Sequence, residues 1–240
     1  MSTPRGAVLT LRWLGGTAVA IAVLVASTGL ATSLARTYER TTTVADPGLA
    51  VLEVDIDAGT VDVIRGGDEV EIVREVAGSW RPPEAASDRV GDRLRLTGSC
   101  RPSFLQTECY TNYTVTVPDD VELVLSSSTG EILVDGGTGD VTATTSAGRI
   151  DLTGMEADVV RASSSVGEVA LAFAEPPTSV DASTSTGRVE VVVPDDATRY
   201  AVDATSSVGD ASVAVPRDPE SPRRITARTS VGEVVVRTAE

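Results

Sequence analysis

Hydroxyl side chains at a repeated position are the first candidates for chemistry in this 240-residue sequence. A Ser or Thr stands three residues before a glycine six times, at Ser127, Thr145, Ser164, Thr184, Ser206 and Thr229. A hydroxyl becomes a nucleophile beside a base such as His or Lys, and this chain has neither, because all twenty of its basic residues are Arg. The pattern therefore favours hydroxyls that cap backbone groups beside a bend.

Paired carboxylates are the second candidates. Asp119-Asp120 and Asp195-Asp196 each follow a proline after an apolar run, which is typical of turns. Sugar-cleaving solenoids do use carboxylate clusters, so a polysaccharide-active enzyme is an alternative interpretation. No catalytic or cofactor-binding residue is assigned.

Metal-binding chemistry has two weak candidates. The segment 135–140 (DGGTGD) resembles a glycine-rich calcium repeat, but it occurs once, whereas real sites of that kind recur. Cys100 and Cys109 cannot complete a zinc shell without His. We therefore expect no metal site, and a disulfide between the two cysteines in an oxidising compartment.

A repeat organises the second half of the chain. Six segments end in a glycine, and these glycines are 18, 19, 20, 22 and 23 residues apart: Gly130, Gly148, Gly167, Gly187, Gly209 and Gly232. A degenerate copy surrounds Gly59. Aligned on the glycine, apolar residues alternate with polar ones, which predicts two strands joined at a glycine bend of positive φ.

The apolar columns can be listed by their offset from the glycine. Seven before it stand Leu123, Val141, Val160, Val180, Val202 and Ile225; five before it, Leu125, Ala143, Ala162, Ala182, Ala204 and Ala227; two after it, Ile132, Ile150, Val169, Val189, Ala211 and Val234; four after it, Val134, Leu152, Leu171, Val191, Val213 and Val236. Two short strands cannot bury a core alone, so the repeats must stack into a solenoid. The sequence predicts an all-β solenoid of about six to seven two-strand coils with an N-terminal β cap, in which 119–240 is the repeat domain.

The charged residues that directly follow the glycines provide a test of how the coils stack. They are Glu131, Arg149, Glu168, Arg188, Asp210 and Glu233, so opposite charges would face each other except at Asp210 and Glu233. Like charges in register would be unfavourable, and the alternation therefore supports coils in register. Insertions are confined to the other edge, which in repeat proteins is often the binding edge.

Residues 49–118 predict a β region with a cysteine loop that caps the solenoid. Alternating runs at 69–75, 92–96 and 113–117 give it strands. At the opposite end Glu240 closely follows the last strand, which leaves a C-terminal edge strand for self-association.

The N-terminus sets the expected compartment. Residues 1–12 form a cytoplasmic N-terminus, 13–35 a transmembrane helix or signal anchor, and 36–48 a linker. Between Arg12 and Arg36 lie 23 uncharged residues, enough to span about 30 Å of hydrocarbon, and Arg5 and Arg12 favour an N-terminus inside. Small residues at Ser33 and Ala35 also fit a cleaved signal peptide, which would leave a secreted protein.

A net charge of −15 excludes one class of partner. An acidic surface repels nucleic acid, so we expect none to bind.

The repeats of the form Ser-Ser-x-Gly-(Glu/Asp/Arg)-(Val/Ile), the strand end Thr116-Val117-Pro118 and the cysteine loop before it resemble the bacterial putative-adhesin family, a domain of unknown function with β-solenoid-like repeats. The resemblance covers about 49–240. Actinobacterial members often join such an ectodomain to an N-terminal membrane segment.

The expected function is that of a non-catalytic, single-pass membrane protein that presents its solenoid to an envelope glycan or protein. A regulatory ectodomain that senses envelope stress is an alternative, which would need a partner protein because only 1–12 would lie inside. A purely structural, self-associating role is a further alternative.

Overall fold

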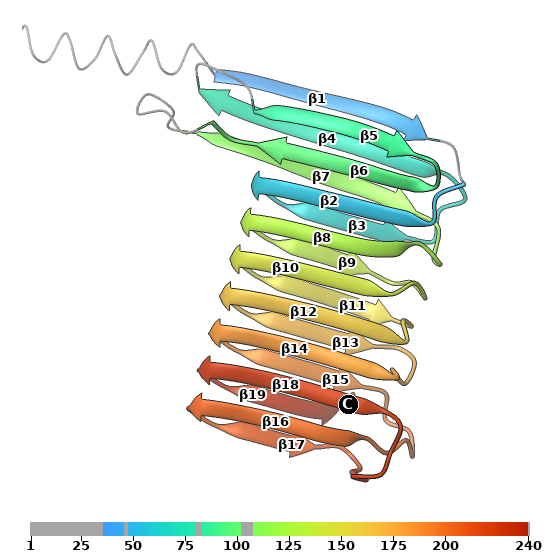
Figure 1. Ribbon diagram of the computed structural model, residues 1–240, viewed down its shortest axis with the longest axis vertical. Helices are drawn as coiled ribbons and strands as arrows, with labels where there is room; N and C mark the ends of the chain where they lie inside the picture. The colour runs from blue at the N-terminus through green and yellow to red at the C-terminus, as the bar shows by residue number, and fades with distance from the viewer. Residues whose placement is uncertain (1–35, 46–47, 80–82, 102–107, 240) are drawn as a thin grey trace, which may run out of the picture.

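The fold is all-β, as the sequence predicts. A computed structural model describes residues 36–45, 48–79, 83–101 and 108–239, and these form nineteen strands in two sheets that face each other, without a helix (Figure 1). Within those ranges no helix is long and apolar enough to cross a membrane. The segment 13–35, expected to form such a helix, lies outside the described residues.

Each coil of the solenoid takes one strand from each sheet. The nine-stranded sheet has the order β5 (Glu84–Val90), β6 (Arg93–Ser99), β2 (Val51–Ala58), β8 (Glu122–Thr129), β10 (Val141–Ala147), β12 (Val159–Val166), β14 (Ser179–Thr186), β18 (Arg224–Val231) and β16 (Ala201–Val208). The ten-stranded sheet has the order β1 (Arg36–Ala45), β4 (Val70–Ser79), β7 (Cys109–Val117), β3 (Val61–Arg65), β9 (Ile132–Asp135), β11 (Ile150–Met155), β13 (Val169–Phe173), β15 (Val189–Val193), β19 (Val234–Thr238) and β17 (Ala211–Ala214). Eight coils stack in parallel, from β6/β7 at the cap end to β16/β17 at the distal end.

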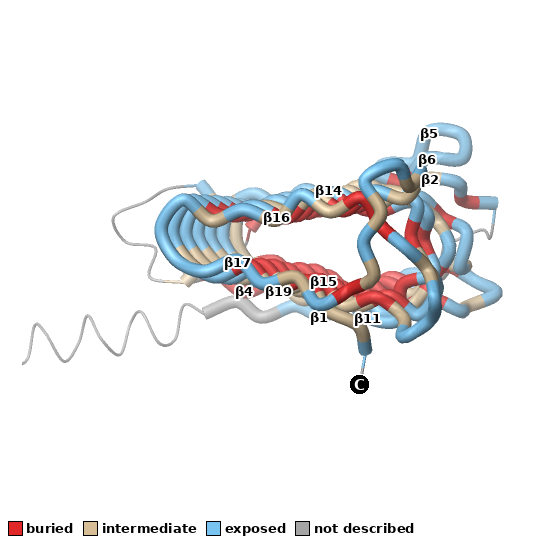
Figure 2. The backbone as a smooth tube through the Cα atoms, turned by 90° about the horizontal axis from the view of Figure 1, so that it is seen from below, coloured by how far each residue is buried: buried red, intermediate tan, exposed pale blue. Residues whose placement is uncertain are grey.

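Identical offsets from the glycine pair between neighbouring coils, which confirms the predicted register. Val141 lies opposite both Leu123 and Val160, and Ile150 lies opposite both Ile132 and Val169. The four apolar columns point between the sheets and are buried in every repeat except β16/β17, at the distal end (Figure 2). The core is therefore a thin layer of Val, Ile, Leu and Ala.

The bend glycines are required for two reasons. Their φ angles lie between 130° and 149°, a region that is essentially restricted to glycine. In addition, in the six coils from Gly130 onward a Cβ would lie only 1.7 to 2.0 Å from the carbonyl oxygen of the neighbouring coil's glycine. At Gly59 the obstructing atom is the Thr111 carbonyl oxygen, 2.2 Å away.

The hydroxyls three residues before the glycines are buried or half-buried, and four of the six act as caps, as expected. The hydroxyls of Ser127 and Thr145 are buried without a hydrogen-bond partner among the described residues. Each of four hydroxyls donates to the glycine carbonyl of the neighbouring coil on the cap side. They belong to Ser164, Thr184, Thr229 and Ser206, and the distances are 3.4, 3.2, 3.2 and 2.9 Å. Their role is structural, because the bonds satisfy carbonyls that the bend leaves free.

Residues 49–118 contribute more than a cap. They supply two coils, β2/β3 and β6/β7, and the second has a disulfide-closed loop where the others have a glycine bend. Cys100 and Cys109 are bonded, with sulfur atoms 2.06 Å apart, which confirms the expected disulfide. Strands β4, β1 and β5 then extend the two sheets by antiparallel pairing.

The linker expected at 36–48 is wrong over most of its length. Residues 36–45 form β1, which pairs with all ten residues of β4. The polar run RTYERTTTVA lacks a clear apolar face, so its strand character comes from pairing with an existing edge.

The predicted C-terminal edge is also wrong. The last coil in the sequence, β18/β19, lies between β14/β15 and β16/β17, so β16/β17 is the distal edge. The insertions at 194–200 and 215–223 have a physical reason here, because the chain skips one coil position and then returns to fill it. At the cap end β2/β3 is similarly placed between β6/β7 and β8/β9.

We predict that Gly167→Ala is far more destabilising than Gly91→Ala. Gly91 has φ +65° with no atom within 4 Å of an added Cβ, so its change costs about 1–2 kcal/mol of left-handed strain. At Gly167 the Cβ would lie 1.8 Å from the Gly148 carbonyl oxygen, which adds at least about 2 kcal/mol of overpacking. Urea unfolding of both variants measures the difference, and equal losses would contradict the stacking argument.

Replacing both Cys100 and Cys109 by Ser should lower the free energy of unfolding by about 2–3 kcal/mol, as the chain-entropy model gives for so short a loop. The coil β6/β7 lies near the cap end, so the repeats beyond it keep their structure. Denaturation of the wild type with and without reductant provides the control. Reduction should reproduce the loss and should leave the double variant unchanged.

Candidate interaction surfaces

The outer face of the nine-stranded sheet carries a hydroxyl array. We use this name for the exposed serines two residues before the six bend glycines from Gly130 onward and for the Ser or Thr that stands four residues before five of them. The members are Ser128, Ser146, Ser165, Ser185, Ser230 and Ser207 in the first column and Ser126, Thr144, Ser163, Ser183 and Thr205 in the second. They point outward because they alternate with the buried columns.

The array is a regular surface. Neighbouring coils are about 4.8 Å apart, so hydroxyls of one column lie within reach of each other. The Ser183 hydroxyl donates to that of Ser163 at 3.3 Å. Such a surface offers donors and acceptors without net charge and without aromatic rings.

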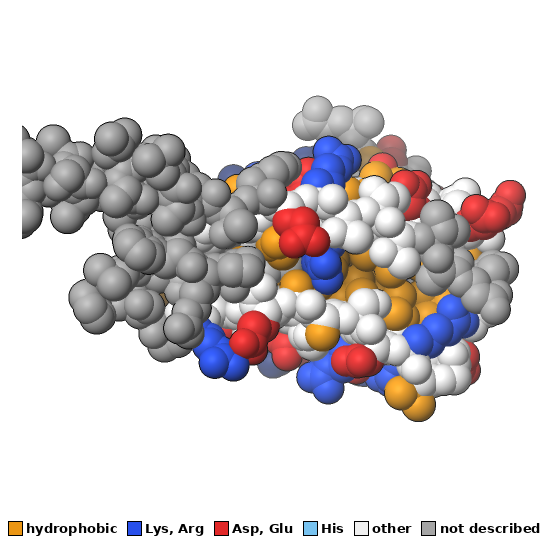
Figure 3. Space-filling view, turned by 90° about the horizontal axis from the view of Figure 1, so that it is seen from above, with side chains coloured by type: hydrophobic (Ala, Val, Ile, Leu, Met, Phe, Trp, Pro, Cys, Tyr) orange, Lys and Arg blue, Asp and Glu red, His pale blue; other side chains and the backbone are white. Residues whose placement is uncertain are grey.

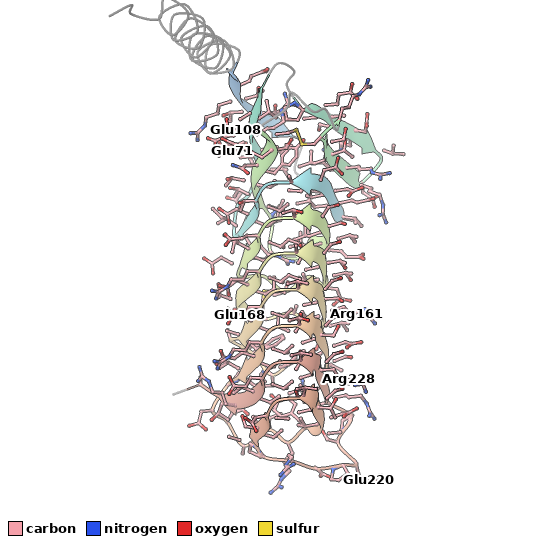
Figure 4. The ribbon with its side chains drawn as sticks, turned by 90° about the vertical axis from the view of Figure 1, so that its left-hand side faces the viewer. Glu71, Glu108, Arg161, Glu168, Glu220 and Arg228 are labelled. Carbon is pink, nitrogen blue, oxygen red and sulfur yellow. A yellow bond between two sulfur atoms is a disulfide. The ribbon has the colours of Figure 1, made fainter. Side chains whose placement is uncertain are left out.

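Charged side chains flank the array. Arg161 and Arg228 project from the same face (Figure 4). Arg228 forms an ion pair with Asp203 of the next coil, and the hydrogen bond within this pair raises the pKa of Arg228. Arg228 stands four residues before Gly232, so it occupies the position where the other repeats have a hydroxyl of the second column.

The bend edge carries the predicted charge column. Arg149 lies 3.6 Å from Glu168, and Arg188 lies 3.3 Å from Glu233. The strand order places Glu233, and not Asp210, beside Arg188. Asp210 therefore ends the column next to a like charge, and it forms no ion pair within the described ranges.

The calcium-like segment at 135–140 packs against an arginine. The buried Arg65 guanidinium donates to the carbonyls of Asp119 and Gly139, and a Cβ at Gly137 would lie 1.8 Å from Arg65 Cδ. Burial lowers the pKa of Arg65 to about 10, against the opposing effect of the Asp119 and Asp120 carboxylates. Gly137, which has no side chain of its own, thus leaves room for the side chain of Arg65.

No metal site appears in the described part of the chain, where no three His, Cys, Asp or Glu side chains converge. The second acidic pair serves a turn, since Asp196 accepts the Thr198 N–H at 2.9 Å.

A pocket of about 410 Å³ opens at the distal end. Its lining residues are Tyr200, Ala201, Val202, Asp203, Arg217, Pro219 and Arg224. The Tyr200 side chain is fully buried, its hydroxyl has no hydrogen-bond partner among the described residues, and burial raises its pKa to about 12. Arg217 and Arg224 form no ion pair in the same part of the chain.

A smaller pocket of about 60 Å³ lies at the cap end, where apolar atoms show between charged side chains (Figure 3). Its lining includes Ile72, Leu96 and Tyr113. The Tyr113 hydroxyl donates to the Thr97 carbonyl at 2.9 Å, and burial raises the pKa of Tyr113. This pocket is too small for more than a few waters.

All of the site residues predicted from the sequence lie within the described part of the chain. The seven glycines form one line along the bend edge, and the cysteines close the coil nearest the cap. The hydroxyl array was missed, although its signal was present as a Ser/Thr-x-Ser alternation before five of the bends.

Comparison with known proteins finds solved structures that are similar to this chain. A structure of a putative cell adhesion protein from Clostridium sporogenes ATCC 15579 is 13% identical, with 85% of this chain and 100% of that chain covered and a TM-score of 0.52. A putative adhesin from Bacteroides fragilis NCTC 9343 is 12% identical, with 84% and 97% covered and a TM-score of 0.41. No curated protein matches the chain.

The family model described as Toastrack DUF4097 matches residues 110–239, which begin in β7 and include every later coil. The match spans more than half of the sequence and confirms the resemblance to an adhesin-like domain of unknown function. This two-sheet solenoid belongs to the Toastrack DUF4097 family.

Proposed function

We propose that this protein is a non-catalytic surface protein that adheres through its solenoid to an extended envelope or extracellular polymer, such as a glycan. The observation that carries the proposal is the hydroxyl array. It repeats one chemical unit from coil to coil on an exposed sheet face.

The array suits a polymer that also repeats. Sugar hydroxyls both donate and accept hydrogen bonds, as Ser and Thr hydroxyls do. A single exposed contact contributes little, but contacts repeated on several coils act together once the first has formed. An uncharged partner also avoids the repulsion that an acidic protein imposes on anions.

Anchoring by residues 13–35 is part of the proposal. Its support is the uncharged run between Arg12 and Arg36. Strand β1 begins at Arg36 in the cap, so an anchored chain would hold its cap end near the membrane and its distal end away from it. The fold shared with the Clostridium cell adhesion protein is consistent with a surface role.

We expect the full-length chain to bind polysaccharide from cell-envelope fractions, and Ser146→Arg/Ser185→Arg to weaken this binding about tenfold or more, equivalent to 1.4 kcal/mol. The two arginines would stand over alternate coils and keep a polymer from the sheet. Binding of the detergent-solubilised chain to an immobilised envelope fraction measures the effect.

Ile64→Arg/Thr153→Arg is the matched control. These residues are also exposed and two coils apart, but they lie on the ten-stranded sheet. This control should bind within about twofold of wild type. Equal losses in both double variants would contradict the assignment to the array, and cleavage of the polysaccharide by the chain would contradict a non-catalytic role.

A further inference from the structure

We propose that the distal end of the solenoid is a docking surface for a second copy of the chain, so that two solenoids join end to end about a two-fold axis. The surface consists of the edge strands β16 and β17, the half-buried apolar residues between them, and the charges at its rim. Figure 2 views the molecule from this end.

The distal edge has unpaired backbone groups and little protection. Strand β17, with the sequence ASVA, carries no charge. The one charge of β16, Asp203, is bound to Arg228 within the chain. Edge strands that must stay unpaired usually carry charges or proline.

The opposite end of the same molecule shows that protection. Its edge strand β5 carries Glu84, Asp88 and Arg89, and β1 carries Glu39 and Arg40. The asymmetry indicates that the distal edge is adapted for pairing.

The core also remains open at the distal end. Val202, Ala204 and Val213 are only partly buried, whereas their counterparts in the β14/β15 coil, Val180, Ala182 and Val191, are at most 1% exposed. Covering them with another pair of strands would continue the core and remove apolar surface from water.

The rim is self-complementary in charge. Asp210 lies at the bend side without an ion pair, and Arg217 and Arg224 lie at the other side, where they line the pocket. The loop also carries Asp218 and Glu220, but neither lines the pocket, and the Asp218 carboxylate accepts the Glu220 N–H. A two-fold axis perpendicular to the sheets reverses the strand direction and places each Asp210 near the arginines of the second copy.

The edge strands fit this axis when β16 pairs with itself in antiparallel fashion around Thr205. In that register Val202 lies opposite Val208 of the second copy, and Asp203 lies opposite Ser207, so like charges do not meet. Val208 is 64% exposed, and the pocket opposite it presents the apolar side chains of Val202 and Pro219. The exposed Val208 of each copy thus meets an apolar pocket of the other.

The size of the surface sets the expected affinity. Eight residues of strand and two sheets about 10 Å apart give roughly 500 Å² per copy, or about 1,000 Å² in total. This is near the lower limit for a specific interface, so we expect a reversible dimer with a Kd on the order of 10 µM. Its two cap ends would point in opposite directions; that such a dimer links two cell surfaces rests on the proposed anchoring.

Sedimentation equilibrium of the full-length chain in a neutral detergent tests the dimer. Asp210→Arg alone, and Arg217→Asp/Arg224→Asp together, should each raise the Kd at least about tenfold. Combining all three changes exchanges the charges across the axis and should restore the Kd to within about threefold of wild type. Glu156→Arg, an equal charge change on an exposed residue of a central coil, serves as the control and should leave the Kd unchanged.

Three results would overturn the inference: a monomer up to 200 µM (about twenty times the expected Kd), a dimer that is insensitive to the rim charges, or open-ended filaments. The urea unfolding curve of each variant verifies that it is folded, which is expected because the changed side chains are exposed. The array variant Ser146→Arg/Ser185→Arg should still form the dimer. Loss of polymer binding and loss of dimerisation therefore report on separate proposals.

Discussion

The close contact between bend glycines is the constraint on which the rest of the structure depends. From Gly130 onward, each bend glycine lies directly against the glycine carbonyl of a neighbouring coil, with no room for a Cβ. This contact fixes the register between coils, and the register in turn places every apolar column inside and both columns of the hydroxyl array outside. A slip by one residue would exchange the two faces and expose the core.

The thin core follows from the same contact. Two strands joined by so tight a bend hold the sheets close together, and the interior accommodates a column of alanines beside columns of Val, Ile and Leu. Among the described residues, the buried rings are Tyr113 in β7, Phe173 at the end of β13 and Tyr200 just before β16. The low aromatic content and the regular outer faces thus have one cause.

The repeated coils were predictable because each carries the same offsets around its glycine. The β6/β7 coil was not, since its bend is a cysteine loop, and neither was β1, whose pairing depends on an edge distant in sequence. The sequence has one feature that distinguishes the coil β16/β17 at the distal end. Ala211 stands where the other repeats have Val or Ile, so this coil lacks one of the branched core residues of the others. The hydroxyl array depends only on alternation and could have been recognised, whereas the pocket at the distal end depends on a loop that returns past its own coil.

The placement of β18/β19 between two earlier coils has a consequence for how the chain acquires its structure. Synthesis produces β16/β17 before the coil that separates it from β14/β15, so sequential stacking cannot yield the native order. The position next to β14/β15 must stay open, or be vacated, until residues 224–238 have been synthesised. Completion of the distal end is therefore coupled to synthesis of β18/β19, and a chain that stops short of β18 lacks the coil on which β16/β17 is built.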